Sequence, residues 1–145
     1  MTVEVLLRKL DPELPTPEQA HPGDAGFDLR SRIDVVLAPG QRASVPTGVA
    51  IALPRGYVGL VTPRSGLARE SGVGMVNAPG VIDAGYRGEV SVLLINHDPT
   101  GSIRLGRGDR IGQLVVLPIP PVRLVEVESL PGSDRGGRGF GSSGR

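Results

Sequence analysis

Short runs of Val, Ile and Leu, separated by turn-forming residues, dominate the pattern of apolar and polar positions along this chain. Runs of this length, bounded by Gly and Pro, are typical of β-strands joined by tight turns. The pattern predicts strands at residues 2–7, 33–37, 42–45, 49–53, 57–62, 89–96, 102–105, 111–119 and 122–127. About ten short strands with almost no helix favour an all-β fold, a distorted jelly-roll or β-barrel. Within 89–96, the run Val-Leu-Leu-Ile is expected to be the buried part.

The segment 63–70 interrupts the β pattern. Ser65 is expected to N-cap one or two helical turns that end at Gly72. A hydroxyl and free backbone N–H groups at a helix start make a natural phosphate site, and the forked donor of Arg64 suits phosphate oxygens. A plain capped turn with a surface arginine explains Arg64, Ser65 and Gly66 as well.

The stretch 76–90 is where we expect the working centre of the chain. The breaker run Ala78-Pro79-Gly80 precedes a β-prone pair, Val81-Ile82, and a polar turn follows. This order predicts a turn-rich hairpin whose backbone N–H and C=O groups form a fixed row that hydrogen-bonds a flat planar ligand, with Asp83 and Tyr86 at its mouth. An ordinary β-hairpin gives the same pattern, because Asp-Ala-Gly is common turn chemistry.

Three more polar side chains are candidates for chemistry. Asp24 and Asp28 lie four residues apart, and two carboxylates near a phosphate site often serve a hard cation such as Mg²⁺. We expect Asp24 to accept backbone N–H bonds within its loop and Asp28 to serve the metal. Gln113 alternates with apolar neighbours, so it points either into a site or to the outer face of its strand.

Composition narrows the function classes. The chain has 145 residues, which suits one domain. Its formal net charge is +1, from 16 basic and 15 acidic residues, which argues against a nucleic-acid partner because such proteins usually carry a basic stripe. The absence of cysteine rules out disulfides, and two histidines argue against a zinc site. No apolar run is long enough to span a bilayer, so we expect no membrane partner and a cytoplasmic protein.

The stretch 129–145 is rich in Gly, Ser and Arg and cannot bury enough apolar surface to fold by itself. We therefore expect a β-barrel domain at 1–128 and a C-terminal arm at 129–145. Composition alone favours a disordered tail. Its glycines nevertheless permit the backbone to wrap an anion closely, and Phe140 is able to stack on a base, which is worth roughly 1–3 kcal/mol.

Taken together, five segments resemble the five motifs of the trimeric dUTPase family, in the same order. They are Asp-Ala-Gly-Phe-Asp-Leu-Arg-Ser at 24–31, Pro-Arg-Ser-Gly-Leu-Ala at 63–68, Gly-Val-Ile-Asp-Ala-Gly-Tyr-Arg-Gly-Glu at 80–89, Arg-Gly-Asp-Arg-Ile-Gly-Gln at 107–113 and Arg-Gly-Gly-Arg-Gly-Phe-Gly-Ser-Ser-Gly at 135–144. Each motif alone is weak, whereas five at fitting spacing are a specific signal.

The resemblance implies a jelly-roll subunit, a homotrimer with active sites at subunit interfaces, and Mg²⁺-dependent hydrolysis of dUTP to dUMP and pyrophosphate. It implies that Asp83 is the catalytic carboxylate, that Tyr86 lies under the deoxyribose and excludes ribose, and that Asp28 binds the metal through water. The residues that it assigns to substrate are Arg64, Ser65, Gly66 and Gln113 for the phosphates, Asn77, Gly80, Val81 and Ile82 for uracil, and Arg135, Phe140, Gly141 and Ser142 in the arm.

Two departures from the family pattern are small. Val81 follows Gly80 at a position where the family often has Thr. This difference should matter little, because the resemblance assigns the backbone of this residue, and not its side chain, to uracil. Arg138 adds a charge to the last motif, so either Arg135, which we prefer, or Arg138 clamps the γ-phosphate. Two alternatives remain at this point: a dCTP deaminase of the same structural superfamily, and a non-catalytic trimeric β-scaffold that binds nucleotides.

Overall fold

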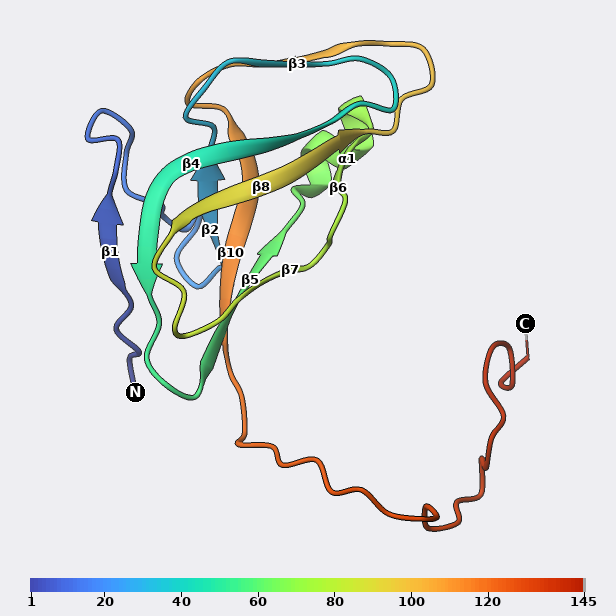
Figure 1. Ribbon diagram of the computed structural model, residues 1–145. Coiled ribbons are helices and arrows are strands. Elements are labelled where there is room, and N and C mark those ends of the chain that lie inside the picture. Colours follow the sequence, from blue (N-terminus) through green and yellow to red (C-terminus); the bar gives the residue numbers. More distant parts are fainter. Residues whose placement is uncertain (145) are drawn as a thin grey trace.

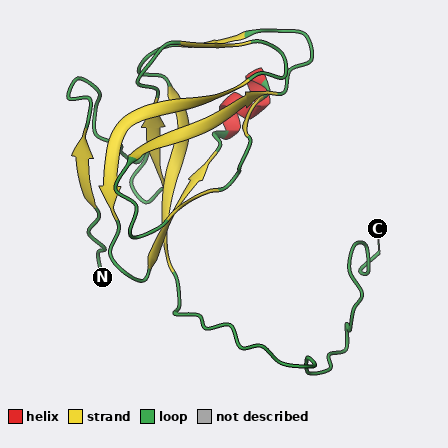
Figure 2. Ribbon diagram, in the orientation of Figure 1, coloured by secondary structure: helices red, strands yellow, loops and turns green. Residues whose placement is uncertain are grey.

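Strands make up nearly all of the regular structure in the computed structural model of the chain, which describes residues 1–144 (Figures 1 and 2). The elements are β1 (Leu6–Lys9), β2 (Gly26–Arg30), β3 (Val35–Leu37), β4 (Arg42–Ala52), β5 (Tyr57–Thr62), α1 (Ser65–Ser71), β6 (Val73–Met75), β7 (Gly80–Ile82), β8 (Glu89–Asn96), β9 (Ile103–Leu105) and β10 (Arg110–Pro118). The predicted all-β class is therefore confirmed.

Two four-stranded sheets and a two-stranded ribbon form the barrel. One sheet has the order β1-β4-β8-β6, the other has the order β2-β10-β5-β7, and β3 pairs with β9. All of these neighbouring strands are antiparallel. In Figure 1, β4 and β8 form part of the front layer, and β2, β10 and β5 lie in the layer behind it. Aliphatic side chains from both layers fill the space between them; those almost fully buried are Leu29, Val45, Val92, Leu94 and Ile111.

Alternation along β8 explains why it forms a half-buried strand. Val92 and Leu94 are buried, whereas Leu93 is 36% exposed on the opposite face. The expectation that the whole Val-Leu-Leu-Ile run is buried is therefore wrong, because successive side chains of a strand point to opposite faces.

A single long strand, β4, replaces the two strands expected at 42–45 and 49–53. It passes through Pro46 and Gly48 with a break in register against β8 between Pro46 and Ala50. Gly48 has φ of 75°, a conformation that favours glycine, so the chain bends at this bulge without ending the strand. The strand β2 was missed, because its five residues carry two charges and few β-branched side chains.

The short helix α1 follows β5 as expected, but its cap differs. Arg64 is the N-cap, with φ −92° and ψ 127°, and no side chain caps the helix, so the prediction that Ser65 is the N-cap is wrong. The helix ends at Gly72, as predicted. Gly72 adopts the left-handed conformation, with φ 66°, and its N–H donates to the Ala68 carbonyl.

The stretch 76–90 is not a hairpin. β7 pairs with β5 in one sheet, whereas β8 pairs with β4 and β6 in the other. The loop between β7 and β8 therefore crosses from one layer to the other. The preceding loop, which includes a cis Ala78-Pro79 peptide bond, makes the opposite crossing from β6 to β7. The prediction failed because local turn chemistry does not reveal which sheet each strand joins.

The strand expected at 122–127 is absent from the part of the chain that the structure describes. This segment leaves the end of β10 as an extended chain that runs away from the barrel (Figure 1). Val122, Leu124, Val125 and Val127 are 77%, 94%, 62% and 55% exposed. Across residues 1–144, no helix has the length and apolar character that a membrane crossing requires.

Candidate functional site

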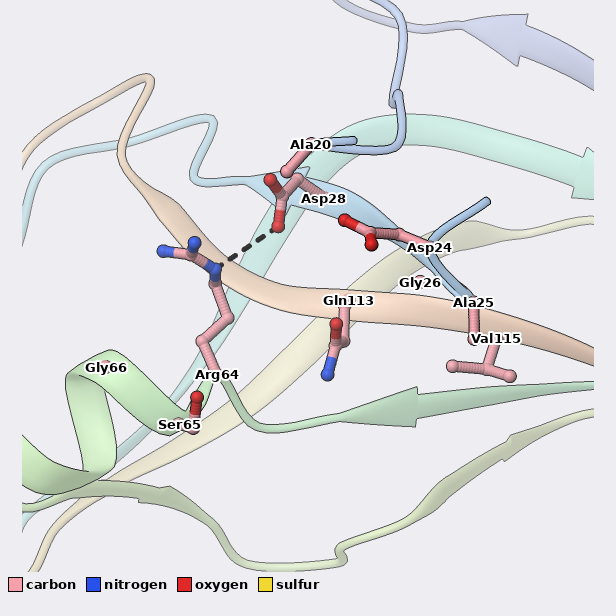
Figure 3. A pocket seen from close by; sticks show the side chains of 10 residues that line it. All are labelled: Ala20, Asp24, Ala25, Gly26, Asp28, Arg64, Ser65, Gly66, Gln113 and Val115. Atoms are coloured by element: carbon pink, nitrogen blue, oxygen red, sulfur yellow. Dashed lines mark ion pairs between the residues drawn. The ribbon is translucent and has the colours of Figure 1, made fainter. Parts of the chain in front are cut away.

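Apart from Asp83, the predicted site residues of the barrel line two open pockets. The first, which we call the Arg64 pocket, has a volume of about 320 Å³ and is lined by Ala20, Asp24, Ala25, Gly26, Asp28, Arg64, Ser65, Gly66, Gln113 and Val115 (Figure 3). The second, the Asn77 pocket, has a volume of about 360 Å³ and is lined by Ser44, Val61, Met75, Asn77, Gly80, Val81, Ile82, Tyr86, Glu89, Val90, Ser91 and Leu93.

Two arginines converge on one carboxylate in the Arg64 pocket. Arg64 Nε lies 3.2 Å from Asp28 Oδ1, and Arg110 Nη1 lies 3.3 Å from Asp28 Oδ2. The Asp28 side chain is 12% exposed and the Arg64 side chain is 27% exposed, so the ion pair is only partly buried. Among residues 1–144, Arg64 is the one basic residue that lines this pocket, beside the carboxylates of Asp24 and Asp28, so a bound anion meets a guanidinium together with two negative charges.

Close packing between β2 and β10 places Gln113 in this pocket. Gln113 is paired with Asp28 on one side and with Thr62 on the other. A Cβ added to Gly26 would lie 3.0 Å from Gln113 Cδ, so the absence of a side chain at Gly26 makes room for the amide. Of the two alternatives left by the sequence, the structure favours the inward one, since Gln113 lines this pocket.

Apart from the Glu89 carboxylate, which accepts hydrogen bonds from Arg32 and from the Gly48 N–H, neutral side chains and backbone line the Asn77 pocket. Ile82 is buried, whereas Val81 is 64% exposed and pairs through its backbone with Leu60 of β5. A Cβ added to Gly80 would lie 3.3 Å from Asn77 Nδ2, so the buried Gly80 packs closely against the amide of Asn77. An uncharged planar ligand with donors and acceptors on its edge matches these groups.

Asp83 and Tyr86 lie in the loop that follows β7. The Asp83 carboxylate is exposed and directly follows Ile82 of the Asn77 pocket, although Asp83 itself lines neither pocket. The Tyr86 N–H donates to the Asp83 carbonyl at 3.0 Å, and the Tyr86 hydroxyl donates to the Glu89 carbonyl at 2.9 Å. These two bonds fix a tight turn that holds both side chains beside the Asn77 pocket.

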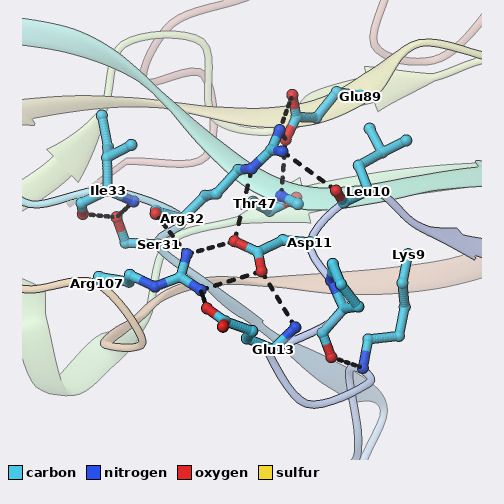
Figure 4. A network of polar contacts seen from close by, with 12 residues as sticks. Lys9, Leu10, Asp11, Glu13, Ser31, Arg32, Ile33, Thr47, Glu89 and Arg107 are labelled. Atoms are coloured by element: carbon cyan, nitrogen blue, oxygen red, sulfur yellow. Dashed lines mark hydrogen bonds and ion pairs between the residues drawn. The ribbon is translucent and has the colours of Figure 1, made fainter.

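A charged network that sequence analysis missed supports the loops around both pockets (Figure 4). Asp11 pairs with Arg107, whose Nη2 donates to Asp11 Oδ1 at 3.0 Å, and with Arg32 at 3.6 Å. Arg32 also pairs with Glu89 at 3.1 Å. The hydrogen bond from Arg107 lowers the pKa of Asp11 to about 2, and the same contact raises the pKa of Arg107. Asp11 precedes the first motif, so no motif pattern could have identified it.

The C-terminal arm contributes to neither pocket in this chain. Arg135 and Arg138 bond instead to each other's carbonyl oxygens, at 2.7 and 2.9 Å. Phe140 is fully exposed, and Gly141 and Ser142 are exposed as well. The structure thus leaves the predicted arm residues apart from the barrel residues they were predicted to assist (Figure 1).

The two candidate metal carboxylates have different surroundings. Asp24 accepts the His21 N–H at 3.0 Å, which confirms its expected place in loop hydrogen bonding. Asp28 is ion-paired with Arg64 and Arg110. Within residues 1–144 there is no group of three His, Cys, Asp or Glu side chains able to hold a metal ion. Both carboxylates line the Arg64 pocket, so a cation that arrives with other ligands meets two pocket carboxylates at most.

Comparison with known proteins gives a consistent result. A family model described as dUTPase matches residues 13–144. The deoxyuridine 5'-triphosphate nucleotidohydrolase of Thermobifida fusca (strain YX) is 58% identical over 143 residues, which are 99% of this chain and 80% of that protein. The solved dUTPase of Staphylococcus bacteriophage 80alpha with dUPNHPP has a TM-score of 0.91 at 34% identity, over 99% of this chain and 100% of that one.

A mutant dUTPase from phage phi11 of S. aureus, whose structure concerns the coordination of a structural Mg(II) ion, has a TM-score of 0.82 at 30% identity. That match covers 89% of this chain and 99% of the phage chain. The likeness to the 80alpha enzyme, at 99% of this chain, extends over most of the C-terminal arm.

Proposed function

This chain belongs to the dUTPase family, and from that premise we propose that it hydrolyses dUTP to dUMP and pyrophosphate. The observation that carries the proposal is the chemical division of the motif residues into two pockets. One pocket combines the guanidinium of Arg64 with the carboxylates of Asp24 and Asp28, and suits a triphosphate that binds together with a cation. The other, apart from Glu89, is lined by neutral side chains and backbone, and suits a pyrimidine.

In this proposal the triphosphate occupies the Arg64 pocket. Arg64 supplies guanidinium donors, while Ser65 and Gly66 supply a hydroxyl and backbone N–H groups at the start of α1. The Gln113 amide adds a neutral donor from β10. Because phosphoryl transfer leaves little covalent chemistry for the protein, positioning and charge stabilisation by these groups supply most of the catalysis.

Uracil occupies the Asn77 pocket, where Asn77 and the backbone at Gly80, Val81 and Ile82 bond to its edge. Tyr86 lies under the deoxyribose and excludes the 2′-hydroxyl of ribose. Rejection of thymine requires that the backbone of β7 lie against the uracil carbon that carries the methyl group in thymine. These assignments rest on the family motifs together with the shared pocket.

Asp83 orients a water molecule and accepts its proton during in-line attack on the α-phosphorus. The water oxygen forms the new bond to phosphorus, the bond from that phosphorus to the bridging oxygen breaks, and pyrophosphate leaves. A general base of this kind contributes on the order of 10²–10⁴-fold to the rate. The exposed position of the Asp83 carboxylate next to the Asn77 pocket supports this role.

We further propose that the working enzyme is a homotrimer whose sites combine the Arg64 pocket of one subunit, the Asn77 pocket of a second and the arm of a third. Arg64 and Asn77 line separate pockets within one chain, Asp83 follows the last residue of β7 without lining either pocket, and the arm lines neither pocket. The extended segment 122–127 exposes four apolar side chains, which supports burial against a neighbouring subunit. The boundary at 129 then separates this segment from the catalytic arm.

Mg²⁺ fits this site only as an ion that binds together with the triphosphate. Mg²⁺ keeps several waters and is usually held by one or two carboxylates plus substrate phosphates. Of the two carboxylates that line the Arg64 pocket, we assign this contact, through water, to Asp28. When bound, the ion would neutralise part of the phosphate charge. The arm, through Arg135 and Phe140, would close over the γ-phosphate and the uracil ring.

Pyrophosphate release measured over the common ribo- and deoxyribonucleoside triphosphates tests the proposal. We expect rapid release from dUTP and little from dTTP, dCTP or UTP. Ammonia release from dCTP would instead indicate a deaminase, and tight dUTP binding without turnover would indicate a nucleotide-binding scaffold.

A further inference from the structure

The ring of Tyr86 lies directly over Gly88, two residues further along the loop. A Cβ added to Gly88 would lie 2.5 Å from Tyr86 Oη, 2.7 Å from Cζ and 3.1 Å from Cε2. Real Cβ atoms do not approach other atoms at the first two of these distances, so any side chain at position 88 displaces the ring. Gly88 has no positive φ, and the constraint therefore comes from space and not from backbone conformation.

The hydroxyl of Tyr86 is also held by a residue that is itself fixed to the barrel. It donates to the main-chain carbonyl of Glu89. The Glu89 carboxylate accepts the Gly48 N–H at 2.9 Å and Arg32 Nη1 at 3.1 Å, contacts that tie it to the bulge of β4 (Figure 4). The Glu89 carbonyl that accepts the Tyr86 hydroxyl is therefore held in place by these contacts. The absence of a side chain at Gly88 leaves the space that the ring needs to reach this carbonyl.

We infer that Gly88 is a specificity-determining residue, which sets the position of the Tyr86 ring and thereby the preference for deoxyribose over ribose. This inference rests on the proposed function, because it assigns Tyr86 to the sugar. An alanine at 88 pushes the ring off the Glu89 carbonyl. The displaced ring no longer blocks the space of a ribose 2′-hydroxyl.

The test compares Gly88→Ala with Gly85→Ala in the same loop. A Cβ at Gly85 meets no atom within 4 Å, and its backbone also lacks a positive φ, so this matched control adds the same methyl group without contact. Both variants are assayed for kcat and KM with dUTP and with UTP. For Gly88→Ala we expect the ratio of kcat/KM for dUTP to that for UTP to fall by roughly 10- to 100-fold. For Gly85→Ala we expect the wild-type ratio.

A double-mutant cycle with Tyr86→Ala isolates the contact. Alanine removes all three ring atoms that the added Cβ meets, so Gly88→Ala should lower the ratio no further in the Tyr86→Ala background. A further loss in that background would mean that position 88 acts without Tyr86. An unchanged ratio in the single Gly88→Ala variant would overturn the inference.

A measurement without nucleotide separates this inference from the proposed function. The chain has two tyrosines and no tryptophan, so Tyr57→Phe leaves Tyr86 as the sole tyrosine emitter. In that background, Gly88→Ala should lower the fluorescence anisotropy of Tyr86, whereas Gly85→Ala should not. A wild-type protein that fails to hydrolyse dUTP would end the proposed function, yet the anisotropy would still report on the contact. Identical anisotropy in all three proteins would contradict the contact itself.

Discussion

Arg64 and Asp28 form an ion pair across the first pocket, with Arg64 Nε 3.2 Å from Asp28 Oδ1. This pair joins the loop before α1 to β2, two segments far apart in the sequence (Figure 3). Within residues 1–144 it is the one ion pair of Arg64, and it uses Nε, so the two terminal nitrogens remain for an anion. Asp28 thus serves as an acceptor that aims the guanidinium, in addition to any contact with a metal.

Asp28→Asn should raise the KM for dUTP by about 10-fold or more even at saturating Mg²⁺, because charge-assisted hydrogen bonds are worth roughly 1.5–3 kcal/mol. The measurement is steady-state kinetics as a function of both dUTP and Mg²⁺. Asp24→Asn is the control, since Asp24 lines the same pocket without an ion pair and an asparagine oxygen still accepts the His21 N–H. A changed Mg²⁺ requirement with an unaltered KM at saturation would mean that Asp28 serves the metal alone.

Asp83→Asn should keep dUTP binding while kcat falls by roughly 10²–10⁴-fold, because the amide cannot accept a proton from water. Binding is measured by calorimetry with dUTP, and turnover by pyrophosphate release. Asp98→Asn provides a control outside both pockets. If kcat were the same as in the wild type, Asp83 would have no part in the chemical step.

Deleting 129–145 should abolish efficient turnover and leave the trimer assembled, because the arm lines neither pocket of its own chain and 122–127 is retained. Sedimentation measures assembly and pyrophosphate release measures turnover. Phe140→Ala should have a smaller effect, since one stacking contact is worth roughly 1–3 kcal/mol. Full activity in the truncated protein would show that the tail is only a linker.

Asp11 makes the stability of the fold depend on acid pH. Its pKa falls from 3.8 to about 2 on folding, mainly through the hydrogen bond from Arg107. A lowered pKa in the folded state stabilises the protein above the ordinary pKa, and this contribution is lost as the pH falls through about 5 to about 2. Asp11→Asn should therefore be less stable than the wild type at pH 7, with a difference that shrinks towards pH 2.

Urea unfolding at one fixed protein concentration measures this difference, because assembly makes apparent stability depend on concentration. Glu4→Gln, an exposed acid before β1, is the control. A stability difference that stays constant from pH 7 to pH 2 would contradict the role of the Asp11 charge.

The sequence predicted local elements well and their partners poorly. The bounds of β5 and β8 are as expected, because alternation and flanking turns specify a strand locally. The loop after β7 was mistaken for a hairpin turn, because its two strands join different sheets. The ion pairs of Asp11 could not be predicted from the sequence, because Arg107 and Arg32 come from segments far from Asp11 along the chain.

The candidate site shows the same difference between local patterns, which the sequence predicted, and contacts between distant residues, which it did not. Motif spacing predicted which residues share a chemical task, and Arg64 and Gln113 do line one pocket. It did not predict that Asp28 is already paired with two arginines, nor that Gly88 makes the space occupied by the Tyr86 ring. Both features depend on distances between side chains, which no motif encodes.

The most direct test of the account mixes two inactive variants. Arg64→Gln and Asp83→Asn subunits, carrying different affinity tags, are denatured together, refolded at equal amounts and assayed for pyrophosphate release from dUTP. If each site takes Arg64 from one subunit and Asp83 from another, random assembly should restore about a quarter of the wild-type rate. Activity no higher than that of the separate variants, in mixed trimers captured through both tags, would contradict a site shared between subunits.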